Sequence, residues 1–191
     1  YKTLAIFGVD VPYDARDPKD YGGAHTYVVS ENYILDGIEL NFQRPTDRGD
    51  RDQASDTPGL RDFADRVYRA QERRFAETGI LTARTEHHLD RAPYFVYDTV
   101  YSDGQAWNTI AATDGALLPT AAAVAVKAAI GLWALWPTPY SARLFETVAD
   151  LADPSRGFYE GRYENGAGLI RAFTANTNGI ILECLRYETQ G

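Results

Sequence analysis

Residues 119–136, PTAAAVAVKAAIGLWALW, are apolar on nearly every side and constrain the fold more than any other segment. Their length approaches that of a membrane span, but Lys127 lies mid-span and alanine outnumbers leucine and isoleucine. A helix that is apolar all round is otherwise one that neighbouring elements bury on every side. We therefore expect a buried helix inside a larger soluble protein, with Trp133 and Trp136 in its core.

Helical periodicity predicts four further helices. They cover residues 30–40, 58–79 and 139–152 and the C-terminal segment from about Asn178. Ser30 and Thr57 are the expected N-caps and Gly79 the expected C-cap, while Arg74 interrupts the apolar side of the second helix. These helices alternate with long loops rich in Tyr, Asp and Glu, an order typical of helical hairpins whose loops carry the function. The predicted fold class is mainly α.

Small β elements are expected between the helices. Residues 1–12 read as a short apolar strand, and turns at 102–104 and 165–166 indicate two hairpins. Residues 43–57 are charged and unpatterned, which predicts a mobile surface loop. The spacing of Asp47, Asp50 and Asp52 is like that of a calcium loop, but the interleaved arginines would repel the ion, so no metal site is predicted.

Composition excludes several classes of partner. The 191 residues suit a single domain, 1–191, and a formal net charge of −8 argues against a protein that tracks nucleic-acid phosphates. The sequence carries no phosphate-binding loop and no dinucleotide fingerprint, so neither a nucleotide nor any other cofactor is expected. The single cysteine, Cys184, cannot form an internal disulfide and is predicted to lie in the core. Because the chain opens with Tyr1 and contains no Met, we expect a processed product or a fragment.

Four long segments carry a family resemblance. They are HTYVVSENYILDGIE (25–39), the stretch from TGILTARTEHHLD to DGQAWNTI (78–110), the stretch from VKAAIGLWALW to GFYEGRYE (126–164) and TANTNGIILECLRYETQG (174–191). They resemble the C-terminal half of DUF3131, a bacterial family of uncharacterised proteins. The resemblance implies an (α/α) toroid related to the six-hairpin glycosidases, which include glucoamylase-like and β-1,2-glucan-cleaving enzymes. It also implies a periplasmic or cell-envelope location.

A toroid of that kind needs more helices than the five expected here. The chain is therefore predicted to be a partial toroid of helical hairpins, with long loops and small β-hairpins. Its partner would be the missing N-terminal half or a second chain, and an apolar face around residues 121–136 would need covering.

The implied activity is glycoside hydrolysis of a bacterial envelope or exported polysaccharide. Such hydrolysis needs two carboxyl groups flanking the scissile bond, one of them a proton donor. The catalytic candidates are Glu31, Asp98 and Glu160, each beside aromatic residues in a loop or at a helix start. The alternative role of Glu31 is an acid favoured by a helix dipole, and Asp98, in an otherwise apolar strand, is alternatively turned outward or bonded to a fixed partner. A non-catalytic glycan-binding or scaffolding module is the alternative function.

The substrate-binding candidates are aromatic or hydrogen-bonding side chains near these acids in the sequence. They are His25, Tyr27, Tyr97, Tyr101, Trp107, Tyr159, Arg162, Asn176 and Asn178. Trp107 is equally suited to be a sugar platform or a core anchor, and one of the asparagines is expected to cap the last helix. Glu160, Arg162 and Glu164 alternate and would share one face of a regular strand, either as a surface ion-pair ladder or as an acid with its tuning cation.

The sequence TEHHLD, residues 85–90, also gathers titratable groups. Adjacent histidines point to opposite sides of a strand, so His87 and His88 do not form a zinc pair. A hydrogen bond from one of them to Glu86 or Asp90 would order the loop.

Overall fold

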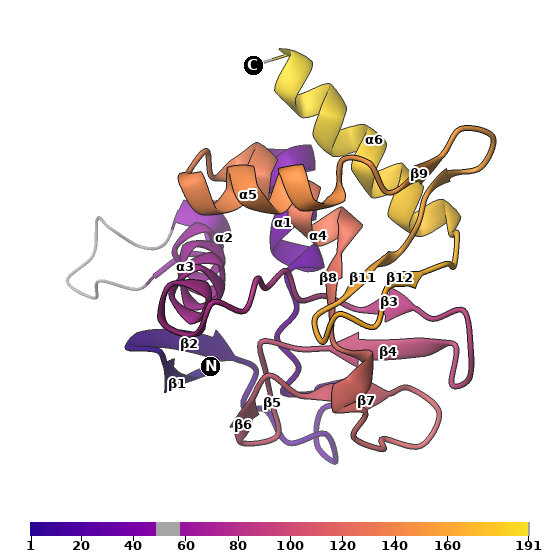
Figure 1. The fold of residues 1–191 in the computed structure, drawn as a ribbon. Coiled ribbons are helices and arrows are strands. Elements are labelled where there is room, and N and C mark those ends of the chain that lie inside the picture. Colours follow the sequence, from indigo (N-terminus) through magenta and orange to yellow (C-terminus); the bar gives the residue numbers. More distant parts are fainter. Residues whose placement is uncertain (49–57, 191) are drawn as a thin grey trace.

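The computed structural model describes residues 1–48 and 58–190, and Figure 1 shows helices gathered on one side of small antiparallel sheets. The helices of ten residues or more are α1 (Glu31–Leu40), α3 (Leu60–Thr78), α4 (Val126–Leu135), α5 (Pro139–Val148) and α6 (Ala175–Gln190). Gly79 ends α3 in the left-handed conformation, with its N–H bonded to the carbonyl of Phe75, as its sequence position predicts. Thr57, the expected N-cap of α3, lies outside the described residues, and Gly59 occupies the cap position.

The prediction of a mainly α partial toroid is wrong. The described residues are 39% helical and 21% strand, a mixed α/β fold with several small antiparallel sheets. The residues between α3 and α4 explain the difference, because they pair as strands rather than running as loops between hairpins. The strands are β3 (His87–His88), β4 (Phe95–Asp98), β5 (Tyr101–Ser102), β6 (Gln105–Ala106) and β7 (Thr109–Ala111). They pair in the orders β3-β4-β7 and β5-β6.

The long apolar stretch is divided among three elements. A 3₁₀ turn, η1 (Pro119–Ala121), leads into strand β8 (Ala123–Ala125), and α4 begins only at Val126. β8 pairs with β11 (Gly161–Tyr163), which pairs in turn with β12 (Leu169–Ile170). The helix is thus shorter than predicted. Because small apolar residues fill the whole run, no alternation of apolar and polar positions marks where the strand ends and the helix begins.

Burial of α4 is confirmed for most of its length, and this chain supplies the cover; Trp133 and Trp136, expected in the core, are half-buried against it. α4 packs against α1, α5 and α6, and every residue from Ala121 to Leu132 is buried. Gly37 of α1 permits this close approach, because a Cβ there would lie 2.7 Å from the side chain of Leu135. The expected apolar face around residues 121–136 is therefore largely covered within the chain itself. Among the described residues, no helix combines the length and apolar character needed to cross a bilayer.

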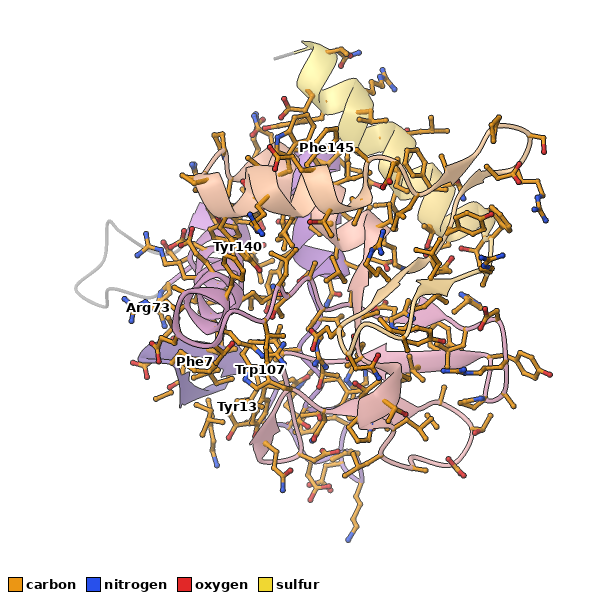
Figure 2. The ribbon with its side chains drawn as sticks, in the orientation of Figure 1. Phe7, Tyr13, Arg73, Trp107, Tyr140 and Phe145 are labelled. Carbon is orange, nitrogen blue, oxygen red and sulfur yellow. The ribbon has the colours of Figure 1, made fainter. Side chains whose placement is uncertain are left out.

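The remaining strands form short hairpins. They are β1 (Lys2–Ile6) with β2 (Val9–Tyr13), and β9 (Ala152–Asp153) with β10 (Gly157–Phe158). The β1–β2 hairpin packs on α3, where Phe7, Tyr13 and Trp107 add to the cluster that joins them (Figure 2). The hairpins predicted at 102–104 and 165–166 are both present, as β5–β6 and β11–β12.

The charged segment 43–57 is described only in part. Residues 45–48 form a single helical turn, α2 (Pro45–Arg48), and the rest of the predicted mobile loop, with Asp50 and Asp52, lies outside the described residues. Asp47 is buried and its carboxylate accepts a hydrogen bond of 2.7 Å from the backbone N–H of Arg44. Its role there is to hold the turn.

Candidate functional site

Residues 82–88 run between the helices and the sheets, and their polar groups bond to both sides. The backbone N–H of Arg84 donates to the side chain of Gln71 on α3 at 2.7 Å, and its carbonyl accepts from the N–H of Ser30 at 3.1 Å. Buried polar groups must be paired to be tolerated. The charged side chains along this segment pair in two clusters. One faces the strands and the other faces the helix N-termini.

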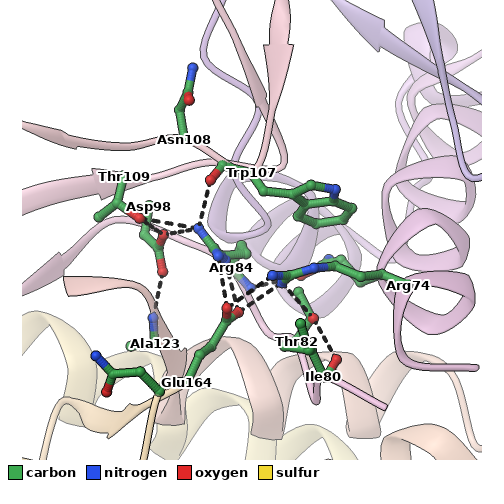
Figure 3. A network of polar contacts seen from close by, with 12 residues as sticks. Arg74, Ile80, Thr82, Arg84, Asp98, Trp107, Asn108, Thr109, Ala123 and Glu164 are labelled. Carbon is green, nitrogen blue, oxygen red and sulfur yellow. Dashed lines mark hydrogen bonds and ion pairs between the residues drawn. The ribbon is translucent and has the colours of Figure 1, made fainter. Parts of the chain in front are cut away.

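The first of these, the arginine cluster, consists of Arg74, Arg84, Asp98 and Glu164 (Figure 3). Arg84 donates to Glu164 through Nε at 2.9 Å and Nη2 at 2.8 Å, and its Nη1 donates to Asp98. Arg74 makes a second pair of hydrogen bonds to the same carboxylate of Glu164, at 2.9 and 3.1 Å. Paired arginine–carboxylate contacts of this kind fix position as well as charge. The interruption of the apolar side of α3 by Arg74 is thereby explained.

Asp98 is fully buried within the arginine cluster. Its carboxylate also accepts hydrogen bonds from Thr109 Oγ1 at 2.6 Å and from the backbone N–H of Ala123 at 2.9 Å, and His87 Nε2 lies 3.7 Å away. Burial acts to raise the pKa of Asp98, but the charge of Arg84, aided by His87 and Thr109, holds that pKa below its ordinary value. Of the roles expected for Asp98, this environment favours the carboxylate bonded to a fixed partner.

The second cluster, the acid cluster, consists of Glu31, Glu86, Lys127 and Asn176. Lys127 forms an ion pair with Glu31, and its Nζ donates to Asn176 Oδ1 at 2.7 Å. The amide of Asn176 donates to Glu31 at 3.3 Å, and the backbone N–H of Glu31 donates to Thr85 Oγ1 at 3.2 Å. Glu31, Lys127 and Asn176 each lie in the first turn of a helix, so the N-termini of α1, α4 and α6 meet here. Helix N-termini favour negative charge.

Glu86 is the second carboxyl group of the acid cluster. Burial raises its pKa above the ordinary value, the nearby charge of Glu31 raises it further, and Lys127 and Thr85 only partly offset the rise. The two carboxyl groups thus differ in environment, because Glu31 is ion-paired with Lys127 while burial raises the pKa of Glu86. Pairs of acids with unlike environments are typical of acid–base sites.

Glu160 lies apart from both clusters in its bonding. It is buried, and its carboxylate accepts hydrogen bonds from the backbone N–H of His88 at 3.1 Å and from Thr174 Oγ1 at 2.5 Å. Thr174 in turn accepts from the N–H of Thr177 in the first turn of α6. Glu160 therefore holds β3 against the start of α6. The ladder expected with Arg162 does not form, since Glu160 bonds here and Glu164 bonds to Arg74 and Arg84.

Five rings form what we call the aromatic row: His25, Tyr27, Tyr97, Phe95 and His88. Ring centroids are 4.8 Å apart for His25–Tyr27 and 5.2 Å for Tyr27–Tyr97. Phe95 meets Tyr97 edge-on at 5.3 Å and His88 at 4.9 Å. His25 is exposed and the other four rings are half-buried, so the row presents aromatic surface to solvent.

The pairing of β3 with β4 relates the acid cluster to the aromatic row. His87 lies opposite Val96 and His88 opposite Phe95, and the ladder ends at His87. Continued by one residue, the same register would set Glu86 across from Tyr97, on the face of the sheet that carries His88 and Phe95. Glu86 directly precedes β3, so it is the residue through which the acid cluster adjoins this sheet.

The other predicted substrate-binding residues serve packing or capping. Tyr101 is buried against Tyr13 at 4.4 Å, and Trp107 stacks over the guanidinium of Arg74 at 4.5 Å, which makes it a core anchor. Tyr159 packs on Phe173 at 4.5 Å. Arg162, on β11, has an Nε atom that is buried without a hydrogen-bond partner among the described residues.

Asn178 acts within α6 and its neighbour. Its side chain donates to the carbonyls of Phe158 at 3.1 Å and Thr174 at 3.0 Å, and accepts from the N–H of Phe158 at 2.8 Å. Asn176 is the asparagine that instead reaches the acid cluster. Of the twelve predicted site residues, Glu31 and Asn176 meet in the acid cluster, and His25, Tyr27 and Tyr97 meet in the aromatic row.

Two residues of this site were missed by sequence reasoning. In the sequence, Glu86 stands beside two histidines and indicates only a loop-ordering hydrogen bond, and Lys127 indicates only that the apolar run does not span a membrane. A lone lysine in an apolar run needs a buried acidic partner. That requirement was the available signal, although the sequence does not show that Glu31 meets it. Within residues 1–48 and 58–190, no group of three or more His, Cys, Asp and Glu side chains is arranged to hold a metal ion.

Comparison with known proteins gives one match. The model of the family described as "Protein of unknown function (DUF3131)" matches residues 1–191. No curated protein and no solved structure matches the chain.

Proposed function

Because the chain belongs to the DUF3131 family across residues 1–191, a family without an assigned function, we propose a function from its own residues. The chain is a carbohydrate-active domain that binds a bacterial envelope or exported polysaccharide along the aromatic row. The acid cluster beside the row supplies the carboxyl groups for glycoside hydrolysis.

One observation carries this proposal. The register of β3 with β4, continued by one residue, sets Glu86 across from Tyr97 of the aromatic row, and the charge of Glu31 lies near enough to Glu86 to raise its pKa. Aromatic rings offer flat apolar faces with polar edges, which suit the alternating C–H and hydroxyl groups of a sugar ring. Hydrolysis of the bond between two sugars needs one proton-donating carboxyl group and one charged carboxylate. In this proposal the aromatic row binds the sugar and the acid cluster supplies both carboxyl groups.

The roles follow from the environments of the two acids. Glu86, with its raised pKa, is the proton donor to the glycosidic oxygen as the bond to the anomeric carbon breaks. Glu31 is ion-paired with Lys127 and bonded to Asn176, so it is the carboxylate that attacks the anomeric carbon or activates a water. Lys127 and Asn176 position Glu31.

A non-catalytic glycan-binding module is the second candidate. The burial of Asp98 and Glu160, each bonded to groups of the protein, favours it, since neither is available to a substrate. Binding then rests on the aromatic row alone. The two candidates make the same prediction for ring substitutions and opposite predictions for the acids.

The binding test uses linear glucose oligosaccharides with β-1,2, β-1,3, β-1,4 and α-1,4 linkages, measured by titration calorimetry. Tyr97→Ala is expected to weaken binding of the preferred sugar about tenfold, because one stacking face is lost. The matched control is Tyr94→Ala. Tyr94 lies three residues before Tyr97 and is 64% exposed, and the variant should bind the sugar as the unmodified chain does. Equal binding by all three proteins, or no binding at all, would refute the proposal.

The cleavage test measures products from the same oligosaccharides. Glu86→Gln and Glu31→Gln should each slow cleavage by at least about 100-fold while binding changes little. Glu39→Gln, an exposed acid at the far end of α1, is the control and should cleave at the normal rate. Binding without cleavage by the unmodified chain would select the glycan-binding module. Normal cleavage by both acid variants would remove these acids from the reaction.

A further inference from the structure

A cavity of about 370 Å³ lies where the end of β2, residues 23–28 and the start of α1 come together. Tyr13, Tyr27, Tyr33 and Phe63 are among the aromatic residues that line it. Polar side chains, Asp14, Arg16 and Asn32 among them, line it as well. A concave site of a few hundred cubic ångströms is large enough for a small ligand, and a mixed aromatic and polar lining suits a polar one.

We propose that this cavity is a second saccharide subsite, which holds one pyranose ring of the same neutral oligosaccharide that lies on the aromatic row. The inference rests on the proposed function. It adds the place where the oligosaccharide continues beyond the aromatic row. Tyr27 and His25 are the link, because both belong to the row and both line the cavity.

The walls suit a sugar ring. Tyr27 lines the cavity, and its ring also lies 5.2 Å from that of Tyr97, which belongs to the row and not to the cavity lining. Burial raises the pKa of Tyr33 to about 12 and also raises that of Tyr27. Both therefore keep their hydroxyl protons at neutral pH and can donate to a sugar oxygen as well as accept from a sugar hydroxyl.

The polar rim favours a ligand without charge. Asp14 and Arg16 line the cavity as a closed pair, in which Arg16 Nε and Nη2 donate to the two carboxylate oxygens at 3.0 and 2.6 Å. Hydrogen bonds from Arg16 lower the pKa of Asp14 to about 2, so the pair stays ionised and its charges cancel. Asn32, exposed on the first turn of α1, adds a neutral amide with donors and an acceptor.

The test fills the cavity without disturbing the row. Asn32→Trp places a large ring at an exposed helix position on the cavity wall, and Glu39→Trp places the same ring two turns farther along the same face of α1. Tyr97→Ala removes a ring of the row outside the cavity. Binding of a glucose hexasaccharide and of the corresponding disaccharide, in the linkage that the unmodified chain prefers, is measured by titration calorimetry.

The inference predicts that Asn32→Trp weakens hexasaccharide binding about tenfold, as the loss of one subsite does, whereas Glu39→Trp leaves it unchanged. Normal hexasaccharide binding by Asn32→Trp together with weakened binding by Tyr97→Ala would overturn the cavity subsite and leave the proposed function standing. Failure of the unmodified chain to bind any of the sugars would overturn both. Equal weakening by Asn32→Trp and Glu39→Trp would also overturn the subsite, since the effect would not depend on the cavity.

Discussion

The arginine cluster and the acid cluster occupy similar positions but balance charge differently. Each joins the helices to the sheets through residues 82–88. In the arginine cluster, Arg74 and Arg84 face Asp98 and Glu164, so two cations meet two carboxylates. In the acid cluster, Lys127 is the cation for both Glu31 and Glu86, and Asn176 contributes only an amide.

This difference separates a structural role from a functional one. Saturated, charge-balanced contacts stabilise a fold and leave no group free to act on a ligand. The acid cluster instead retains a carboxyl group, Glu86, whose pKa is raised by burial and by a like charge. Such a group lowers the stability of the fold when it is charged, so a requirement for stability alone would not keep it. We therefore assign the arginine cluster to holding the layers together and the acid cluster to chemistry.

The largest effect is expected at Asp98. Asp98→Asn keeps the shape of the side chain but leaves the buried guanidinium of Arg84 one carboxylate short, which should lower the free energy of unfolding by about 4 kcal/mol. Because the folded pKa of Asp98 is lowered, its stabilisation is present above the ordinary aspartate pKa of about 3.9 and is lost as the pH falls through the folded value. The difference between variant and unmodified chain should therefore narrow in acid. Urea unfolding at several pH values measures it.

A milder variant covers the case in which Asp98→Asn does not fold. Thr109→Val removes only the hydroxyl that donates to Asp98 and should cost about 1–2 kcal/mol. Asp150→Asn, at an exposed position after α5, should change the stability by less than about 0.5 kcal/mol. If Thr109→Val were as stable as the exposed control, the arginine cluster would not hold the layers together.

A smaller loss is expected from the single cation of the acid cluster. Lys127→Met leaves Glu31 and Glu86 without their counter-charge at a largely buried place, and should lower the free energy of unfolding by about 2–3 kcal/mol at neutral pH. The loss should shrink in acid, where the carboxylates take up protons.

The double variant Lys127→Met, Glu31→Gln isolates the interaction. Once the carboxylate of Glu31 is gone, the lysine has less to neutralise, so the double variant should be more stable than Lys127→Met alone. Additive losses from the two substitutions would show that Lys127 and Glu31 do not stabilise each other, and the positioning role of Lys127 would fail with that result.

Local elements of the fold could be predicted where one residue decides a boundary. Ser30, Gly79 and the turn at 165–166 mark the start of α1, the end of α3 and the β11–β12 hairpin correctly. The fold class could not, because β3, β4 and β7 are two to four residues long and gain their order from one another rather than from local propensity. The toroid was an inference by resemblance, and the pairing of residues 87–111 contradicts it.

The site was predictable only in part for the same physical reason. Aromatic character could be recognised, so His25, Tyr27 and Tyr97 were chosen and do lie together. Whether an acid is paired depends on partners distant in sequence: Arg84 for Asp98, Thr174 for Glu160 and Lys127 for Glu31. A carboxylate between tyrosines looks the same in the sequence whether it will face a guanidinium or a substrate.

The smallest effect concerns Glu86 and has the opposite sign. Burial and the charge of Glu31 raise its folded pKa, so the folded chain holds this proton more tightly than the unfolded chain does. The contribution of Glu86 to stability is then highest below the ordinary glutamate pKa of about 4.3 and falls as the pH rises through the folded value. Glu86→Gln removes that penalty, so it should be more stable than the unmodified chain at pH 7, by no more than about 1 kcal/mol, and equally stable at about pH 3.

Thermal unfolding at both pH values, with exposed Glu39→Gln as the control, measures this difference. A variant that is less stable at pH 7 would mean that Glu86 gains more from Lys127 than it loses to Glu31. The acid cluster would then be a second structural cluster like the arginine cluster, and the contrast between the two would disappear. If Glu86→Gln were more stable than the unmodified chain and also failed to cleave the sugar, the result would instead show that the chain keeps an unfavourable charge at this position for its function.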